Sequence, residues 1–168
     1  MPGVPFSGLP DSARVWIFAA AQPVHGDEAE RLVGAAESFV RGWASHGEPV
    51  MGAIDWRHDH FLIVAADEEA TGVSGCSTDS LFHTLRNIER ELGLSLLDSS
   101  LVWFRNDTGA VRVLSRPEFR ELVELGEITE RTPVFDNTVG TMRQVRSGEW
   151  ERPFAESWHG RAFGRRRS

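Results

Sequence analysis

Apolar and polar positions alternate along this chain of 168 residues in a pattern that predicts a series of strands and helices. Runs rich in β-branched and aromatic residues are typical of strands, and they cover Arg14–Ala20, Val50–Trp56, Phe61–Ala66, Ser100–Arg105 and Ala110–Ser115. Apolar residues spaced by three and four predict helices: from Asp27, as the cap, to Gly47, from Ser77 to Leu92, from Pro117 to about Leu125, and a short one over Asn137–Arg146.

The order of these elements predicts the fold class. The first four strands and two helices run β-α-β-β-α-β, the ferredoxin-like order. We therefore expect an α+β protein with a largely antiparallel sheet, to which the fifth strand and the C-terminal helices are additions. Residues 1–163 are expected to form a single domain, and residues 164–168 a disordered tail.

Composition narrows the classes of function. The net charge is −7, and all 18 basic residues are arginine, which argues against a broad nucleic-acid surface. No apolar run approaches the length of a membrane span, and the N-terminus lacks the pattern of a secretory signal. A single cysteine favours a reducing cytoplasm. Without lysine there is no phosphate-binding loop of the Walker type, and no cofactor is predicted.

The most informative local feature is the segment Gly75-Cys76-Ser77, which lies between a predicted strand and the start of a predicted helix. The N-terminus of a helix favours a thiolate, so Cys76 is a candidate nucleophile. Ser77 or Thr78 would cap the helix and leave backbone N–H groups for an anion, and Asp79 could orient a base. A lone cysteine before a helix is more often a small packed residue, beside ordinary capping residues, and this explains the same sequence without any chemistry.

The expected topology gives Cys76 its neighbours. In the ferredoxin-like order, Arg14, His46 and Arg105 would gather at the same end of the sheet as Cys76. Arg14 could bind an anion, and His46 could pair with the thiol, unless it only satisfies carbonyl groups at a helix end. The histidines of the first turn and of the Arg57–His60 hairpin tip would lie at the opposite end; solvated histidines are expected there, and no metal site is predicted.

The C-terminal segment is rich in aromatic residues. Trp150, Phe154, Trp158 and Phe163 could fold back over an open sheet face. Alternatively, Trp158 and His159 could wall a pocket or dock against a second subunit, which leaves a homo-oligomer open.

Several stretches resemble a known family: 11–17, 43–47, 74–79 and 155–159, where other members have similar phrases such as A-H-G, G-C-S-[IT]-D and E-S-W-H. The family comprises small bacterial cytoplasmic proteins that often carry the label "ABC transporter ATPase", a label at odds with the missing phosphate loop. The resemblance covers most of the chain and points to Arg14, His46, Cys76 and His159. It implies a cytoplasmic protein and assigns no reaction.

Three functions follow as hypotheses. The first is a binding module for a small anionic molecule or a protein partner, with its site at Arg14, His46, Cys76, Ser77, Thr78, Asp79, Trp158 and His159. The second is a thiol-dependent enzyme with Cys76 as nucleophile and His46 or His159 as base. The third is an assembly role for the C-terminal aromatic residues. Neither nucleic acid nor a membrane is expected as a partner, and whether the protein is an enzyme stays undecided.

Overall fold

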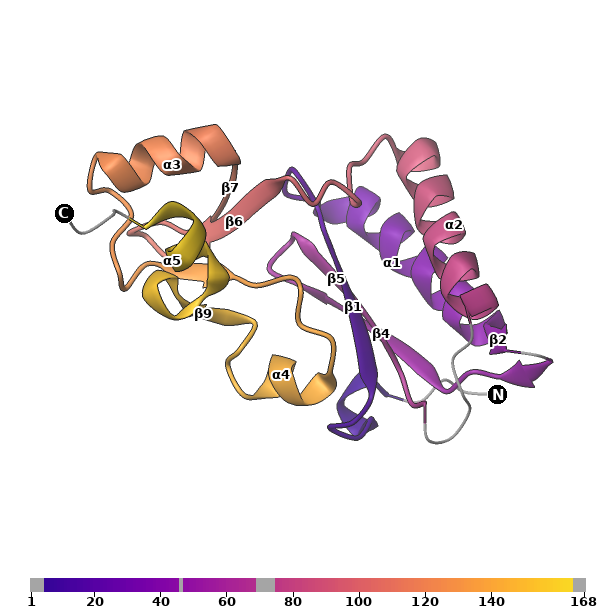
Figure 1. Ribbon diagram of the computed structural model, residues 1–168. Coiled ribbons are helices and arrows are strands. Elements are labelled where there is room, and N and C mark those ends of the chain that lie inside the picture. Colours follow the sequence, from indigo (N-terminus) through magenta and orange to yellow (C-terminus); the bar gives the residue numbers. More distant parts are fainter. Residues whose placement is uncertain (1–4, 46, 69–74, 165–168) are drawn as a thin grey trace.

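The computed structural model describes residues 5–45, 47–68 and 75–164, with only the backbone described for residues 75 and 76. Its elements form four layers: two helices, a first sheet, a second sheet, and a last layer of helices (Figure 1). One apolar cluster fills each of the three spaces between the layers.

The first sheet has the strand order β1-β5-β4, formed by β1 (Arg14–Ala19), β5 (Phe61–Ala66) and β4 (Gly52–Arg57). Both pairings are antiparallel. All six residues of the central strand β5 are buried, because both faces of the sheet are covered. Leu62 and Val64 pack into the helix layer, whereas Phe61 and Ile63 pack toward the second sheet, as the two-residue period of a strand requires.

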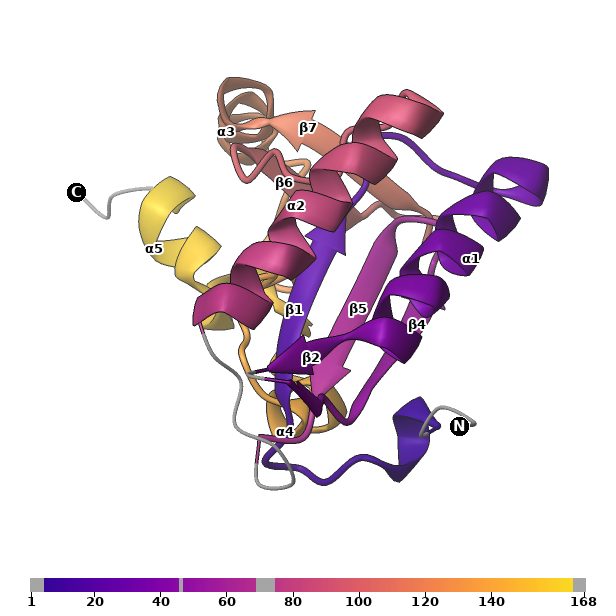
Figure 2. The same cartoon turned by 90° about the vertical axis from the view of Figure 1, so that its right-hand side faces the viewer.

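Helices α1 (Gly26–Gly42) and α2 (Gly75–Leu92) lie side by side over one face of the first sheet (Figure 2). Leu32, Ala36 and Val40 of α1 face Leu81, Leu85 and Ile88 of α2 in the same apolar cluster. The short hairpin of β2 (Ala44–Ser45) and β3 (Glu48–Pro49) follows α1.

The second sheet has the order β7-β6-β8-β9, with β7 (Val111–Ser115), β6 (Leu101–Arg105), β8 (Pro133–Phe135) and β9 (Glu151–Pro153). Trp103 of β6 packs toward the first sheet, and Val102 and Phe104 pack on the opposite side. That side is covered by α3 (Arg116–Glu124) and α5 (Trp158–Phe163). Three short elements complete the fold: η1 (Phe6–Gly8), α4 (Met142–Arg146) and η2 (Phe154–Glu156).

The predicted α+β class is confirmed, and so is most of the predicted order of elements. The first three strands lie as a ferredoxin-like sheet has them, in the order first, third, second. The fourth predicted strand, β6, does not pair with β1; within the described residues it pairs with β7 and β8 instead. Tertiary pairing decides this, because β6 has β7 on one edge and β8 on the other, and neither edge is left for β1.

The altered position of β6 overturns one prediction about the site. Arg105, at the end of β6, was expected beside Arg14 and opposite the hairpin tip. Its Nη2 lies 3.4 Å from Nε2 of His58 in that tip, and its guanidinium pairs with Glu151 at 2.8 Å. The two groups predicted at opposite ends of the molecule therefore lie together.

Several predicted boundaries were also wrong. Helix α1 begins at Gly26 and ends at Gly42, so Asp27 lies within its first turn and Gly47 lies beyond its end. Helix α2 begins at residue 75, so neither Ser77 nor Thr78 is its cap. The helix predicted over Asn137–Arg146 begins only after Thr141, whose side chain completes a capping box with Gln144.

The strands β2, β3, β8 and β9 were not predicted, because strands of two or three residues carry no readable period. Helix α5 was not predicted either, because its six residues make fewer than two turns. The predicted tail at 164–168 falls almost wholly outside the described residues. Among the helices in the described ranges, none has the length and apolar character to cross a bilayer.

The loop between α2 and β6 depends on one carboxylate. Oε2 of Glu89 accepts hydrogen bonds from the backbone N–H groups of Leu96 at 2.7 Å and Leu97 at 3.1 Å. We expect Glu89→Ala to lower the free energy of unfolding by about 2 kcal/mol, because two partly buried N–H groups lose a charged acceptor. Urea denaturation measures the change. Glu91→Ala, on the exposed side of the same helix, is the control; an equal loss in both variants would contradict the role of Glu89.

Candidate functional site

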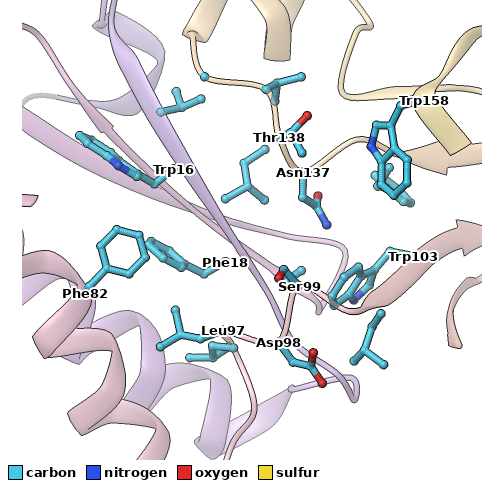
Figure 3. A pocket seen from close by; sticks show the side chains of 18 of the residues that line it. Trp16, Phe18, Phe82, Leu97, Asp98, Ser99, Trp103, Asn137, Thr138 and Trp158 are labelled. Atoms are coloured by element: carbon cyan, nitrogen blue, oxygen red, sulfur yellow. The ribbon is translucent and has the colours of Figure 1, made fainter. Parts of the chain in front are cut away.

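A cavity of about 400 Å³ lies along the outer edge of β1 (Figure 3). All six residues of β1, from Arg14 to Ala19, line it. Since consecutive side chains of a strand point to opposite faces of the sheet, a cavity that touches every residue of β1 looks onto the edge of the strand rather than onto one face. This is the edge that the fourth strand of a ferredoxin-like sheet would occupy.

The walls of the cavity come from two layers of the fold. Phe82 of α2, Leu96 and Leu97 extend the apolar cluster beneath the helices. Trp103 and Val139 belong to the cluster between the two sheets. The cavity is therefore largely apolar and aromatic. Its remaining wall holds the polar residues Asp98, Ser99, Asn137 and Thr138, together with Trp158 and His159 at the start of α5.

The edge of β1 is closed at both ends by other parts of the chain. At its start, the Val15 N–H donates to the Gly140 carbonyl at 3.0 Å, and the Ala13 carbonyl accepts from Met142 N–H at 2.8 Å. Beyond its end, the Ala21 N–H donates to the Ser95 carbonyl at 3.1 Å. The cavity occupies the stretch between these closures.

The backbone along this stretch has unused hydrogen-bonding groups. The Val15 N–H donates on the side of β1 that faces away from β5. Because the direction of the backbone groups alternates along a strand, the N–H and C=O groups of Ile17 and Ala19 also point away from β5. Within the described part of the chain these groups have no partner. Unpaired backbone groups in an apolar surrounding are costly, which makes the cavity receptive to a ligand that can hydrogen-bond.

Two side chains add further donors. The indole Nε1 of Trp158 is buried, has no hydrogen-bond partner in the described structure, and lies on the side of the ring turned toward Thr138 and Asn137 (Figure 3). Asn137 accepts from Trp150 Nε1 through its Oδ1 at 2.9 Å. Its amide nitrogen points toward Trp103 and Ser99 (Figure 3).

His159 lies behind Trp158, with the two rings stacked at 3.9 Å between centroids. Its Nδ1 is 2.7 Å from the hydroxyl of Ser157, which also accepts from the His159 N–H at 3.0 Å and so caps α5. Burial lowers the pKa of His159 to about 4, against the opposing effect of the Asp136 carboxylate and with a smaller lowering by Arg116. The imidazole is therefore neutral at physiological pH.

Charged groups stand at opposite ends of the cavity. Arg14 is at the first residue of β1 and packs its guanidinium over Trp16, 4.7 Å from the ring centroid. Its ion pair with Glu68 is long, at 3.5 Å, and both side chains are exposed, so the pair is weak. Asp98 lies at the other end, beside the loop that follows α2. Its carboxylate accepts from Ser100, and these hydrogen bonds lower the pKa of Asp98.

The site residues predicted from the sequence divide into two groups. Arg14, Trp158 and His159 all line the cavity beside β1. His46 and the side chain of Cys76 lie outside the described residues, so their predicted pairing stays a prediction. The resemblance that named both residues is likewise untested.

The remaining predicted residues lie in the first turns of α2 and do not line this cavity. Ser77 is buried, and its carbonyl accepts from Trp43 Nε1 at 2.9 Å. Thr78 is half-buried and Asp79 is exposed. Helix α2 reaches the cavity through Phe82 instead.

The hairpin tip has a packing role in the structure. The His58 ring stacks on Trp150 at 6.0 Å, and burial, with the positive charge of Arg105, lowers its pKa. His60 is buried, and its Nδ1 lies 2.8 Å from the His58 carbonyl. In the described ranges no three His, Cys, Asp or Glu side chains are arranged to hold a metal ion.

Sequence reasoning missed the edge of β1 and the loop residues that face it. The polar segments that contain Asp98, Asn137 and Thr138 carry no recognisable motif. These residues lie beside β1 because β6 belongs to the second sheet and does not cover this edge. Comparisons with models of protein families, with curated proteins and with solved structures found no match.

The buried neutral state of His159 predicts a pH dependence of stability. The unfolded histidine titrates near its ordinary pKa of 6.5 and the folded one near 4, so the unfolded chain takes up a proton first as the pH falls. We expect the contribution of His159 to the free energy of unfolding to be constant above pH 6.5. As the pH falls toward 4, this contribution should decrease by about 3 kcal/mol.

Urea denaturation between pH 4 and 7.5 measures this slope. His159→Gln should flatten it, apart from the smaller slope of the same sign that His58 supplies. His83→Gln, at an exposed position of α2, should keep the full slope. A slope unchanged by His159→Gln would contradict the assignment.

Proposed function

We propose that the protein is a binding module whose site is the cavity beside β1. Its ligand is a small, largely apolar molecule that carries hydrogen-bonding groups and an anionic group. The observation that carries this proposal is the combination of a cavity of about 400 Å³ with unpartnered donors on its walls, the Trp158 indole N–H and the outward backbone groups of β1. Apolar cavities of this size with a few convergent polar groups are the usual form of small-molecule sites.

The charge distribution supports an anionic group at one end. Arg14 is held over Trp16 and paired only weakly with the exposed Glu68, so a ligand carboxylate, phosphate or sulfonate can replace Glu68 at little cost. The ligand would therefore place its anion at the start of β1 and its apolar body between Phe82, Trp103 and Trp158.

An enzymatic role has less support among the described residues. The hydrogen-bonded pair of Ser157 and His159 is a helix cap: Ser157 is buried, and its hydroxyl is used by the backbone and ring of the same turn. A thiol reaction at Cys76 and an assembly role for the C-terminal aromatic residues stay hypotheses from the sequence, as does the cytoplasmic location.

An anionic aromatic dye tests the proposal. We expect 8-anilinonaphthalene-1-sulfonate to bind the folded protein at one site, with a rise in dye fluorescence and quenching of the tryptophan emission, because Trp16, Trp103 and Trp158 line the cavity. Trp158→Phe should weaken the dye about fivefold to tenfold, since one hydrogen-bond donor and part of the stacking surface are lost.

The matched control is Trp56→Phe. Trp56 also has a buried indole nitrogen without a partner in the described structure, but it lies on β4 and does not line the cavity. Cooperative urea unfolding of each variant ensures that the dye reports a folded protein. Absence of saturable binding, or equal weakening by both substitutions, would overturn the proposed site.

A further inference from the structure

The open edge of β1 sets a geometric requirement on what the cavity binds. The groups that point into the cavity are the C=O of Val15 and the N–H and C=O groups of Ile17 and Ala19, which alternate donor and acceptor along an extended backbone. The nearest closures, at Gly140 and at Ser95, leave room for a partner that is extended, short and able both to donate and to accept.

The length of this stretch can be estimated from strand geometry. On this edge of the described structure, the residues with both backbone groups unpaired are Ile17 and Ala19. A partner strand therefore needs residues opposite Ile17, Phe18 and Ala19, which is about three residues or about 10 Å at about 3.3 Å per residue. The addition of a strand to a sheet edge is a common mode of peptide recognition. The closures at both ends exclude a long strand, so a free short peptide fits better than a segment within a protein chain.

The charges at the two ends match the termini of such a peptide. Arg14, at the first residue of β1, can bind a carboxylate, and the ionised Asp98 beside the far end can bind an ammonium group. A peptide with its carboxylate at Arg14 and its amino group at Asp98 runs antiparallel to β1. Its side chains would alternate between the Phe82 and Leu97 wall and the Trp103 and Trp158 wall, both of which favour apolar residues.

We infer that the cavity beside β1 binds a short apolar peptide of about three residues with free termini, paired antiparallel to the open edge of β1. This inference rests on the proposed function and names the class of ligand. The peptide backbone satisfies Ile17 and Ala19, and its carboxylate displaces Glu68 from Arg14.

The peptide Leu-Leu-Leu is the probe, titrated into the full chain and followed by tryptophan fluorescence and calorimetry. In this pairing the first and third residues face β1, so methylation of the amide nitrogen of the third residue, opposite Ile17, removes a donor to the strand edge and keeps the apolar side chains. C-terminal amidation removes the carboxylate. Each change should weaken binding about tenfold, the effect of one backbone or charge-assisted hydrogen bond.

Arg14→Gln should weaken the free-acid peptide about tenfold and leave the affinity of the amidated peptide unchanged. Arg31→Gln, at an exposed position of α1 away from the cavity, is the matched control and should change neither. This difference between the two peptides separates an ionic contact at Arg14 from a general loss of stability.

The outcomes separate this inference from the proposed function. If the dye binds but Leu-Leu-Leu does not, or if the methylated and amidated peptides bind as tightly as the parent, the peptide inference is overturned and the binding site stands. If neither dye nor peptide binds, both are overturned. A dimer in sedimentation analysis that excludes the peptide would place a second copy at the edge and would also overturn the inference.

Discussion

The pairing of β1 is the constraint on which the rest of this structure depends. A strand of a sheet must satisfy backbone groups on two sides, and β1 is paired along its whole length only with β5. On its other side the chain closes the two ends of the strand, at Gly140 and at Ser95, and leaves the middle open. This partial closure creates the cavity and determines which of its walls are polar.

The four-layer arrangement also follows from the fact that β6 does not pair with β1. Because β6 pairs with β7 and β8, its residue Trp103 can pack against the outer face of the first sheet while Phe104 faces α3. The Trp103 indole donates to the Ala20 carbonyl at 2.8 Å, which joins the second sheet to the end of β1. The same side chain thus supports the junction of the two sheets and one wall of the cavity.

The C-terminal segment completes the site from the far side of the second sheet. Phe154 and Phe163 pack with Phe119 of α3, and this packing holds the short helix α5 in place. Trp158 at its start then reaches the cavity, and Ser157 caps the helix through His159. The aromatic residues of this segment therefore have two roles: Phe154 and Phe163 belong to the apolar core, and Trp158 lines the cavity.

Local chemistry alone determined the α+β class, the position of β5 and the start of α3 near Pro117, because a continuous apolar run and a proline in the first turn of a helix act over a few residues. The sequence also pointed to Arg14, Trp158 and His159. Only the tertiary structure decided that they share one cavity, because β6, the strand expected to cover β1, pairs with β7 on one edge and with β8 on the other. Long-range backbone pairing of this kind leaves no local pattern in the sequence.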